Sequence, residues 1–194
     1  MKKYLSLGLA LVLIFSLSCG MFAAVETEED YEPITAANED SEITMWMDHP
    51  YIKVQPTNTT SSGRSTYTIY MAQNEIEGCQ FFLAPSADKS GLTASVSDFV
   101  NSKGDKLTPE LFKEYYTSIG DLGLQADQIV PYAGEAFDIS ADHSQAFYIK
   151  VKTAADTPAG DYEATVTVKD SADNEVKKAK VFLHVWKFAL SEKT

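Results

Sequence analysis

The chain has 194 residues, a formal net charge of −12 and two cysteines. This acidic balance argues against binding to nucleic acids or to anionic membrane surfaces, because both partners require basic patches. Hydrophobic residues make up 44% of the chain, so a sizeable apolar core is available to stabilise an exported protein without disulfides.

The first 24 residues predict export. Two lysines precede an apolar run from Leu5 to Leu17, and small residues follow, which is the pattern of a secretory signal peptide. Two processing routes stay open: ordinary cleavage after Gly20, Ala23 or Ala24, and lipoprotein processing that would acylate Cys19. We expect a secreted or cell-envelope protein that touches the membrane only through the signal peptide or this lipid anchor.

Residues 25–42 predict an acidic, disordered linker. They combine many aspartates and glutamates with few apolar side chains, and they show no clear period. Residues 43–190 have the length of one β-sandwich domain, and residues 191–194 form a short C-terminal tail.

Apolar runs separated by turn residues predict strands in the first half of that domain. Cys79 falls inside one of them, and no His or Lys lies near it in sequence, so we expect a small buried hydrophobe rather than a reactive thiol. The strands predicted here are residues 43–47, 51–55, 66–72, 76–84 and 92–96.

The segment after Thr108 carries conflicting patterns. Thr108 as an N-cap, Pro109 at the first helical position and Glu110 in the first turn favour a helix. The β-favouring residues that follow, and the β-rich surroundings, favour a strand at Leu111–Ile119. Loops are then expected through Gly120, Gly123 and Pro131, before a short strand at residues 137–139.

Residues 145–168 contain two alternating strand patterns on either side of the turn at residues 156–161. Pro158 fixes φ in this turn and Gly160 supplies a permissive backbone. A period of two with one apolar face predicts an antiparallel hairpin that covers a core on one side and faces water on the other. The predicted core residues are Phe147, Ile149, Val151, Tyr162, Ala164, Val166 and Val168, and the opposite face of the first strand carries Ala146, Tyr148 and Lys150.

The last strand, residues 178–190, is apolar on both faces. Val181, Leu183 and Val185 alternate with a second apolar set at Phe182, Trp186 and Phe188. A strand that covers one core has no need of that second set. Either the strand is central and covered, or Phe182, Trp186 and Phe188 form a domain-docking face.

The sequence offers no catalytic residue, cofactor motif or metal site. It contains no P-loop, dinucleotide fingerprint or nucleophile elbow, and His49, His143 and His184 lack metal-binding spacing. Surface charge explains the carboxylate pairs Glu75/Glu77 and Asp138/Asp142. Loop aspartates leave calcium as a minor option, namely Asp121, Asp127, Asp138 and Asp142.

Aromatic side chains are the remaining candidates for ligand contact. Most belong to strand patterns, where packing is the expected role, but such rings can also form a sugar-stacking platform. The available rings are Trp46, Tyr51, Tyr67, Tyr70, Tyr115, Tyr116 and Tyr132. Among them, Trp46 and Tyr132 are the candidate glycan contacts.

Four segments, in order along the chain, resemble the N-terminal β-sandwich domain of glycoside hydrolase family 123 and related DUF4091 proteins. Residues 71–85 (MAQNEIEGCQFFLAP) resemble that domain's "arNEyEsfQlvl" strand, and residues 127–131 its "pD.L.P" loop. Residues 156–168 (DTPAGDYEATVTV) are similar to its "dtPaGdYtgtvtv" hairpin, and residues 185–190 (VWKFAL) to its "VWdFtLP" strand. The family also has a strand near residues 111–116, which decides our prediction there against a helix.

The resemblance implies an all-β fold, an antiparallel β-sandwich of the immunoglobulin-like or galactose-binding-like kind. In that family the catalytic Asp-Glu pair, which acts on N-acetylhexosaminides, belongs to a following (β/α)8 barrel, and no catalytic residue can be carried over to this chain. We therefore expect a non-catalytic accessory domain that packs against a barrel in cis or in trans. A stand-alone carbohydrate-binding or cell-envelope adhesion module is the alternative.

Overall fold

The computed structural model describes residues 34–191, which lie within one compact unit. The predicted signal peptide, the possible lipid anchor at Cys19 and most of the C-terminal tail lie outside the described residues. No helix among residues 34–191 is long and apolar enough to cross a membrane.

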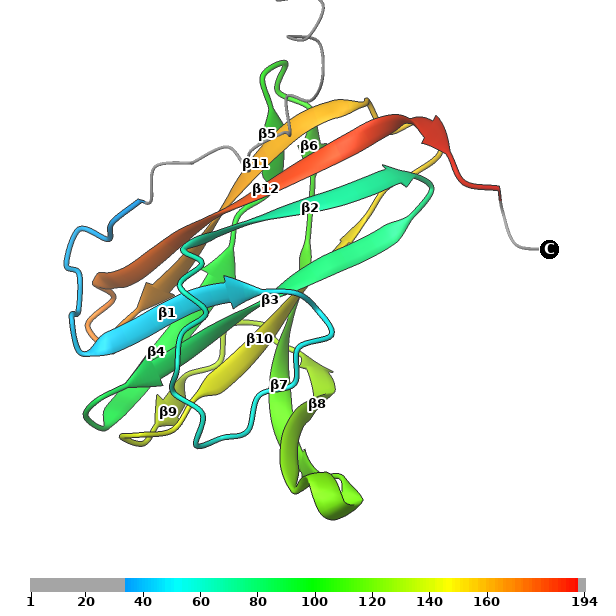
Figure 1. Cartoon of the computed structure of the whole chain (residues 1–194). Helices are drawn as coiled ribbons and strands as arrows, with labels where there is room; N and C mark the ends of the chain where they lie inside the picture. Colours follow the sequence, from blue (N-terminus) through cyan, green and yellow to red (C-terminus); the bar gives the residue numbers. More distant parts are fainter. Residues whose placement is uncertain (1–33, 192–194) are drawn as a thin grey trace, which may run out of the picture. The chain divides into compact units, whose positions relative to one another are not determined.

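The described chain folds into two facing β-sheets, which confirms the predicted all-β sandwich (Figure 1). The first sheet has the strand order β1-β3-β10-β7-β8, and the second has the order β2-β12-β11-β4-β9, with β5 pairing β11 and β6 pairing β5. One short 3-10 turn, η1 (Gly120–Leu122), precedes β8. The strands are β1 (Ile43–Asp48), β2 (Thr66–Gln73), β3 (Ile76–Pro85), β4 (Lys89–Val96), β5 (Phe99–Asn101), β6 (Lys106–Leu107), β7 (Glu110–Ser118), β8 (Leu124–Pro131), β9 (Phe137–Ile139), β10 (Gln145–Lys152), β11 (Gly160–Lys169) and β12 (Glu175–Ala189).

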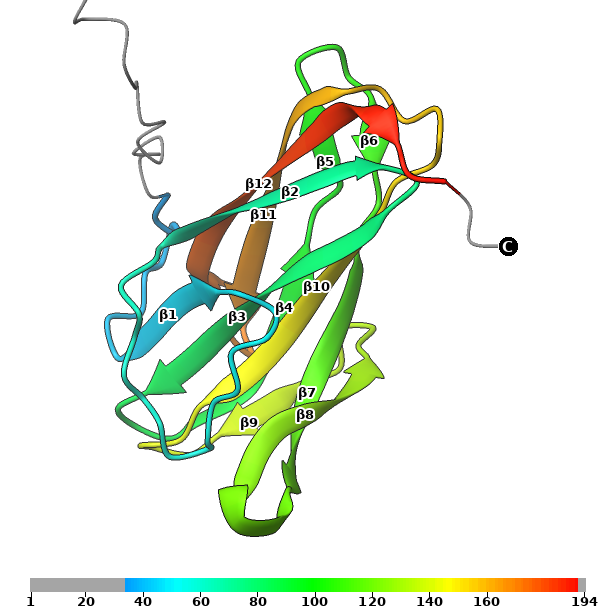
Figure 2. The same cartoon turned by 45° about the vertical axis from the view of Figure 1, so that its right-hand side comes forward.

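The core lies between the two sheets, which face each other in Figure 2. The predicted alternation places side chains in that core correctly. Phe147 of β10 stacks on Phe81 of β3, with ring centroids 4.8 Å apart. Every predicted core position of β10 and β11 is buried, and Cys79 is fully buried beside them. Burial raises the pKa of the Cys79 thiol, which keeps it protonated and unreactive.

The predicted hairpin at residues 145–168 is wrong in its pairing. Strand β10 pairs with β3 and β7 in the first sheet, whereas β11 pairs with β12, β4 and β5 in the second. Residues 153–159 therefore cross from one sheet to the other. The two apolar faces fill the same core from opposite sides, which satisfies the alternation as well as a hairpin would.

The second sheet is mixed rather than wholly antiparallel. Strand β2 pairs with β12 in parallel, with Tyr70 opposite His184 and Met71 opposite Val185. All other strand pairs in the two sheets are antiparallel among the described residues. The parallel pair places the aromatic residues of β2 and β12 side by side on one sheet face.

The outer face of the first sheet is covered by the loop between β1 and β2. The predicted strand at residues 51–55 belongs to this loop, in which Val54 accepts a hydrogen bond from the Ala126 amide of β8 (3.2 Å). Val54 packs in a second apolar cluster that includes Trp46, Phe82 and Ala146. The outer face of β10 is thus partly covered, and the prediction that it faces water is wrong at Ala146.

Two further segments bear on the predictions. Strand β7 confirms the strand at residues 111–119, but β8 occupies residues 124–131, where we expected loops.

Part of the predicted linker is ordered against the second sheet. The amides of Asn38 and Asp40 donate hydrogen bonds to the carbonyl groups of Glu175 and Val176 at the start of β12, both at 3.0 Å. Residues 34–42 are therefore packed on the sandwich, while residues 25–33 lie outside the described part.

Candidate functional site

The most prominent exposed feature is a row of aromatic rings on the outer face of β2 and β12. Tyr70, Trp186 and Phe188, here called the aromatic surface, are 57%, 42% and 52% exposed. The Trp186 ring lies 6.1 Å from Tyr70 and 5.9 Å from Phe188, with interplanar angles of 25° and 11°. Side chains of one face recur every second residue along a strand, so β12 sets this spacing.

A histidine and an aspartate flank the aromatic surface. His184 follows the same alternation, and its ring centroid lies 6.0 Å from Tyr70 and 6.1 Å from Trp186. Its Nδ1 atom lies 2.6 Å from Asp161 Oδ1 on the neighbouring strand β11. The pair orients the imidazole and places a polar group beside the apolar rings, which is the usual composition of a contact surface.

The predicted docking face divides into a buried and an exposed part. Phe182 lies on the same strand and alternation as Trp186 and Phe188, but it is only 9% exposed. The exposed part is therefore the end of β12 nearest the chain's C-terminus (Figure 1). Tyr70 extends it from β2, which the sequence did not indicate, because the parallel pairing of β2 and β12 is a long-range feature.

Three of the four segments that carry the family resemblance meet beside the aromatic surface, where the chain crosses between the sheets. They are residues 71–85, 156–168 and 185–190. Asn74 Nδ2 donates to the Leu190 carbonyl (3.0 Å), and the Leu190 amide donates to the Gln73 carbonyl (2.9 Å). Gln73 Nε2 donates to the Thr157 carbonyl (2.6 Å). These residues hold the crossings between the sheets together and tie Leu190, directly after β12, to the turn that follows β2.

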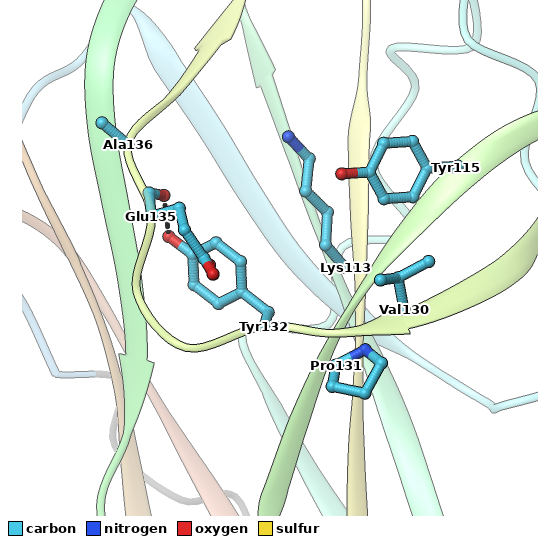
Figure 3. A pocket seen from close by; sticks show the side chains of 7 residues that line it. All are labelled: Lys113, Tyr115, Val130, Pro131, Tyr132, Glu135 and Ala136. Carbon is cyan, nitrogen blue, oxygen red and sulfur yellow. Dashed lines mark hydrogen bonds between the residues drawn. The ribbon is translucent and has the colours of Figure 1, made fainter.

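A second candidate site is a pocket of about 250 Å³ between β7 and the connection from β8 to β9 (Figure 3). Tyr132, a predicted glycan contact, forms one wall. Its hydroxyl donates to the Glu135 carbonyl (2.6 Å) and accepts from the Ala94 amide (3.2 Å), so the ring is held in place. The pocket, here called the Lys113 pocket, is lined by Lys113, Tyr115, Val130, Pro131, Tyr132, Glu135 and Ala136.

Trp46, the other predicted glycan contact, is not accessible. It is 2% exposed and stacks on Phe82 with ring centroids 5.1 Å apart, beneath the β1–β2 loop. A ligand could reach the ring only if that loop left the sheet. Its role is therefore packing.

The remaining predicted polar residues are dispersed. His49 Nδ1 contacts the Tyr67 hydroxyl, whereas His143 contacts the Ala141 carbonyl. Glu75 accepts a hydrogen bond from the Ala72 amide, and burial, reinforced by the Glu75 charge, raises the pKa of Glu77. Among residues 34–191 no three His, Cys, Asp or Glu side chains are grouped so as to hold a metal ion.

No protein-family model and no curated protein matches this sequence. Among solved structures, a family 123 glycoside hydrolase from Clostridium perfringens is similar over 78% of this chain, with a TM-score of 0.58 and 13% identity. The chain spans 28% of the length of that enzyme. Self-complemented MyfA, the major subunit of Myf fimbriae from Yersinia enterocolitica, is similar over 74% of this chain with 8% identity, but its TM-score of 0.40 is too low to carry an argument. The described sandwich therefore shares its fold with part of a family 123 glycoside hydrolase.

Proposed function

We propose that this chain provides a non-catalytic accessory β-sandwich of an exported family 123-like glycoside hydrolase. In this proposal the aromatic surface packs against a (β/α)8 catalytic barrel, supplied in cis or in trans. Export depends on the signal peptide expected at residues 1–24. The carrying observation is the exposure of Tyr70, Trp186 and Phe188 in one continuous row.

Physical reasoning supports a protein partner for this surface. Tyrosine and tryptophan dominate the energetics of protein interfaces, because large rigid rings bury much apolar area at little conformational cost. The fold similarity to part of a family 123 hydrolase makes a barrel of that family the natural partner. The hydrogen bonds of Asn74 and Gln73 would hold the end of β12 in a defined direction beside it.

Binding to a separately produced barrel tests the proposal. The probe is the catalytic barrel of a family 123-like hydrolase encoded in the same genome, and the readout is calorimetry with the purified full chain. We expect Trp186→Ala/Phe188→Ala to weaken binding at least tenfold, which corresponds to about 1.4 kcal/mol, as the loss of interface anchor residues does. Circular dichroism checks that the variant remains folded.

Tyr51→Ala is the matched control, because Tyr51 is 70% exposed but lies in the β1–β2 loop, outside the aromatic surface. It should bind like the wild type. A genome without such a barrel, no binding by the wild type, or equal binding by the double variant would each overturn the proposal.

Glycan binding is the second candidate function, and exposed rings together with the Tyr132 wall of the Lys113 pocket favour it. Aromatic rings bind sugars by stacking on their apolar faces. Affinity gel electrophoresis in polymers of N-acetylhexosamines tests this candidate with the full chain. Retarded migration that Trp186→Ala abolishes would support binding of these polymers at the aromatic surface, and unchanged migration in every polymer would exclude that binding.

A further inference from the structure

We propose that the Lys113 pocket binds the carboxylate of a small acidic sugar of the hexuronate class, with the Lys113 ammonium group as its anchor. The inference deepens the second candidate function by naming a ligand class. The docking of a barrel on the aromatic surface does not depend on it.

The first observation is a partly buried lysine that forms no ion pair among the described residues. Most lysines between residues 34 and 191 form an ion pair with a carboxylate. The lysines of this range without one are Lys103, Lys113, Lys152 and Lys187. Of these only Lys113 is partly buried, while the other three are exposed.

Two carboxylates lie near enough to act on Lys113, but neither forms an ion pair with it. Burial lowers the pKa of the ammonium group, and the charges of Asp138 and Glu135 oppose this effect. Asp138 Oδ1 accepts a hydrogen bond from the Gly91 amide (2.8 Å), and Glu135 Oε2 accepts one from the Ala133 amide (3.0 Å). Both carboxylates are thus held by loop amides rather than by the lysine.

Two aromatic rings keep the lysine in position. Its Nζ atom lies 5.0 Å from the centroid of Phe137 and 5.5 Å from that of Tyr115, within the range of cation–π attraction. Figure 3 shows the Lys113 side chain extending between Tyr132 and Tyr115. The anchor is therefore preorganised, which reduces the entropy lost on binding.

The size and polarity of the pocket limit the class of ligand that it can bind. A volume of about 250 Å³ is below the ~300–1,000 Å³ of pockets that bury drug-sized ligands, so it suits a single sugar ring. Tyr115 and Tyr132 offer apolar surfaces for that ring, and the Glu135 carboxylate can accept a hydrogen bond from a hydroxyl group. Glu135 and Asp138 repel any anion, but they repel a phosphate dianion about twice as strongly as a carboxylate, whose single charge also matches the single Lys113 ammonium group.

Titration of the full chain with D-glucuronate and D-galacturonate, followed by NMR, tests the inference. We expect a Kd of about 1 mM, the affinity that ordinary ligand efficiency gives a one-ring ligand. Lys113→Met keeps the aliphatic stem over the rings but removes the charge, and it should weaken binding at least tenfold. Lys152→Met, which removes an exposed lysine without an ion pair, should leave the affinity unchanged.

Parallel titrations with glucose and with inorganic phosphate separate the possible failures. Equal affinity for glucose and glucuronate would overturn the inference but leave glycan binding standing. Equal affinity for phosphate, unchanged binding by Lys113→Met, or no binding of either uronate at 50-fold the expected Kd would also overturn it. Barrel binding by the same Lys113→Met sample should remain at the wild-type level.

Discussion

Replacing Glu114 with glutamine is expected to stabilise the protein above pH 7 by about 3 kcal/mol while leaving its stability near pH 4 almost unchanged. Glu114 on β7 is 1% exposed, and neither carboxylate oxygen has a hydrogen-bond partner among the described residues. An unpaired buried carboxylate is costly when it is charged and much less so when it is protonated. Glutamine keeps the shape of the side chain and cannot ionise.

The pH window follows from the shift of the Glu114 pKa. Burial raises the pKa from its ordinary value of 4.5 to about 7, with the Lys53 charge opposing the shift and the Asp127 charge reinforcing it. Between these two values the unfolded chain has released the proton and the folded protein still holds it. Stability therefore falls as pH rises through this window, and the loss is complete above pH 7.

Urea denaturation of both proteins at pH 4, 5, 6, 7 and 8 measures the effect. The difference between variant and wild type should grow with pH up to about 7 and then level off. Glu110→Gln is the matched control, because Glu110 lies on the same strand but is exposed in an ion pair with Lys150, where about 0–1 kcal/mol is expected. A pH-independent difference for Glu114→Gln would contradict this prediction.

The inner faces of the strands were predictable because alternation is a local property. Phe147, Ile149 and Val151 repeat with period two whichever strand they pair with, and all three are buried. The assignment of β10 and β11 to different sheets is not local. It rests on pairings and contacts between distant segments, such as the hydrogen bond from the Thr153 hydroxyl to the Ala72 carbonyl 81 residues away (2.7 Å), which no short-range pattern reveals.

The covered outer face was not predictable for the same reason. Ile52 and Val54 alternate like a strand, but they pack as a loop against Trp46 and Ala126 instead of joining a sheet. A period of two shows that one side of a segment is apolar, but it does not show whether the segment pairs as a strand in a sheet or covers a sheet as a loop. The glycan contact expected at Trp46 failed because this loop buries the ring.

The aromatic surface was partly predictable from the sequence, whereas the Lys113 pocket was not predicted. Trp186 and Phe188 stood out because a strand that covers one core has no need of a second apolar set. Lys113 was missed, although its position carried a usable clue: it shares the alternation of Leu111 and Tyr115, so a charged residue falls on an inward-facing set. The carboxylates that act on Lys113 without pairing with it, Asp138 of β9 and Glu135 of the preceding connection, are brought near it by the fold and not by sequence spacing.

Replacing Phe147 with alanine is expected to reduce the free energy of unfolding by about 3–5 kcal/mol, the usual effect of deleting a fully buried aromatic ring. Phe147 is completely buried and contacts three rings, those of Phe81, Tyr132 and Phe137, with centroids 4.8, 5.3 and 5.1 Å away. The cavity would lie in the close-packed core between the two sheets, where the surroundings have little freedom to collapse into it.

The measurement is urea denaturation at pH 6, with Ile76→Ala as the control. Ile76 lies in the same sheet but is exposed, so its truncation should change stability by roughly 0.5 kcal/mol or less. Phe147→Leu, which retains much of the buried volume, should lose less than Phe147→Ala. Equal losses for Phe147→Ala and Ile76→Ala would mean that the two sheets do not close over Phe147, and the two-sheet packing would then be wrong. A loss of the expected size would be a large fraction of the roughly 5–15 kcal/mol that stabilises a typical domain.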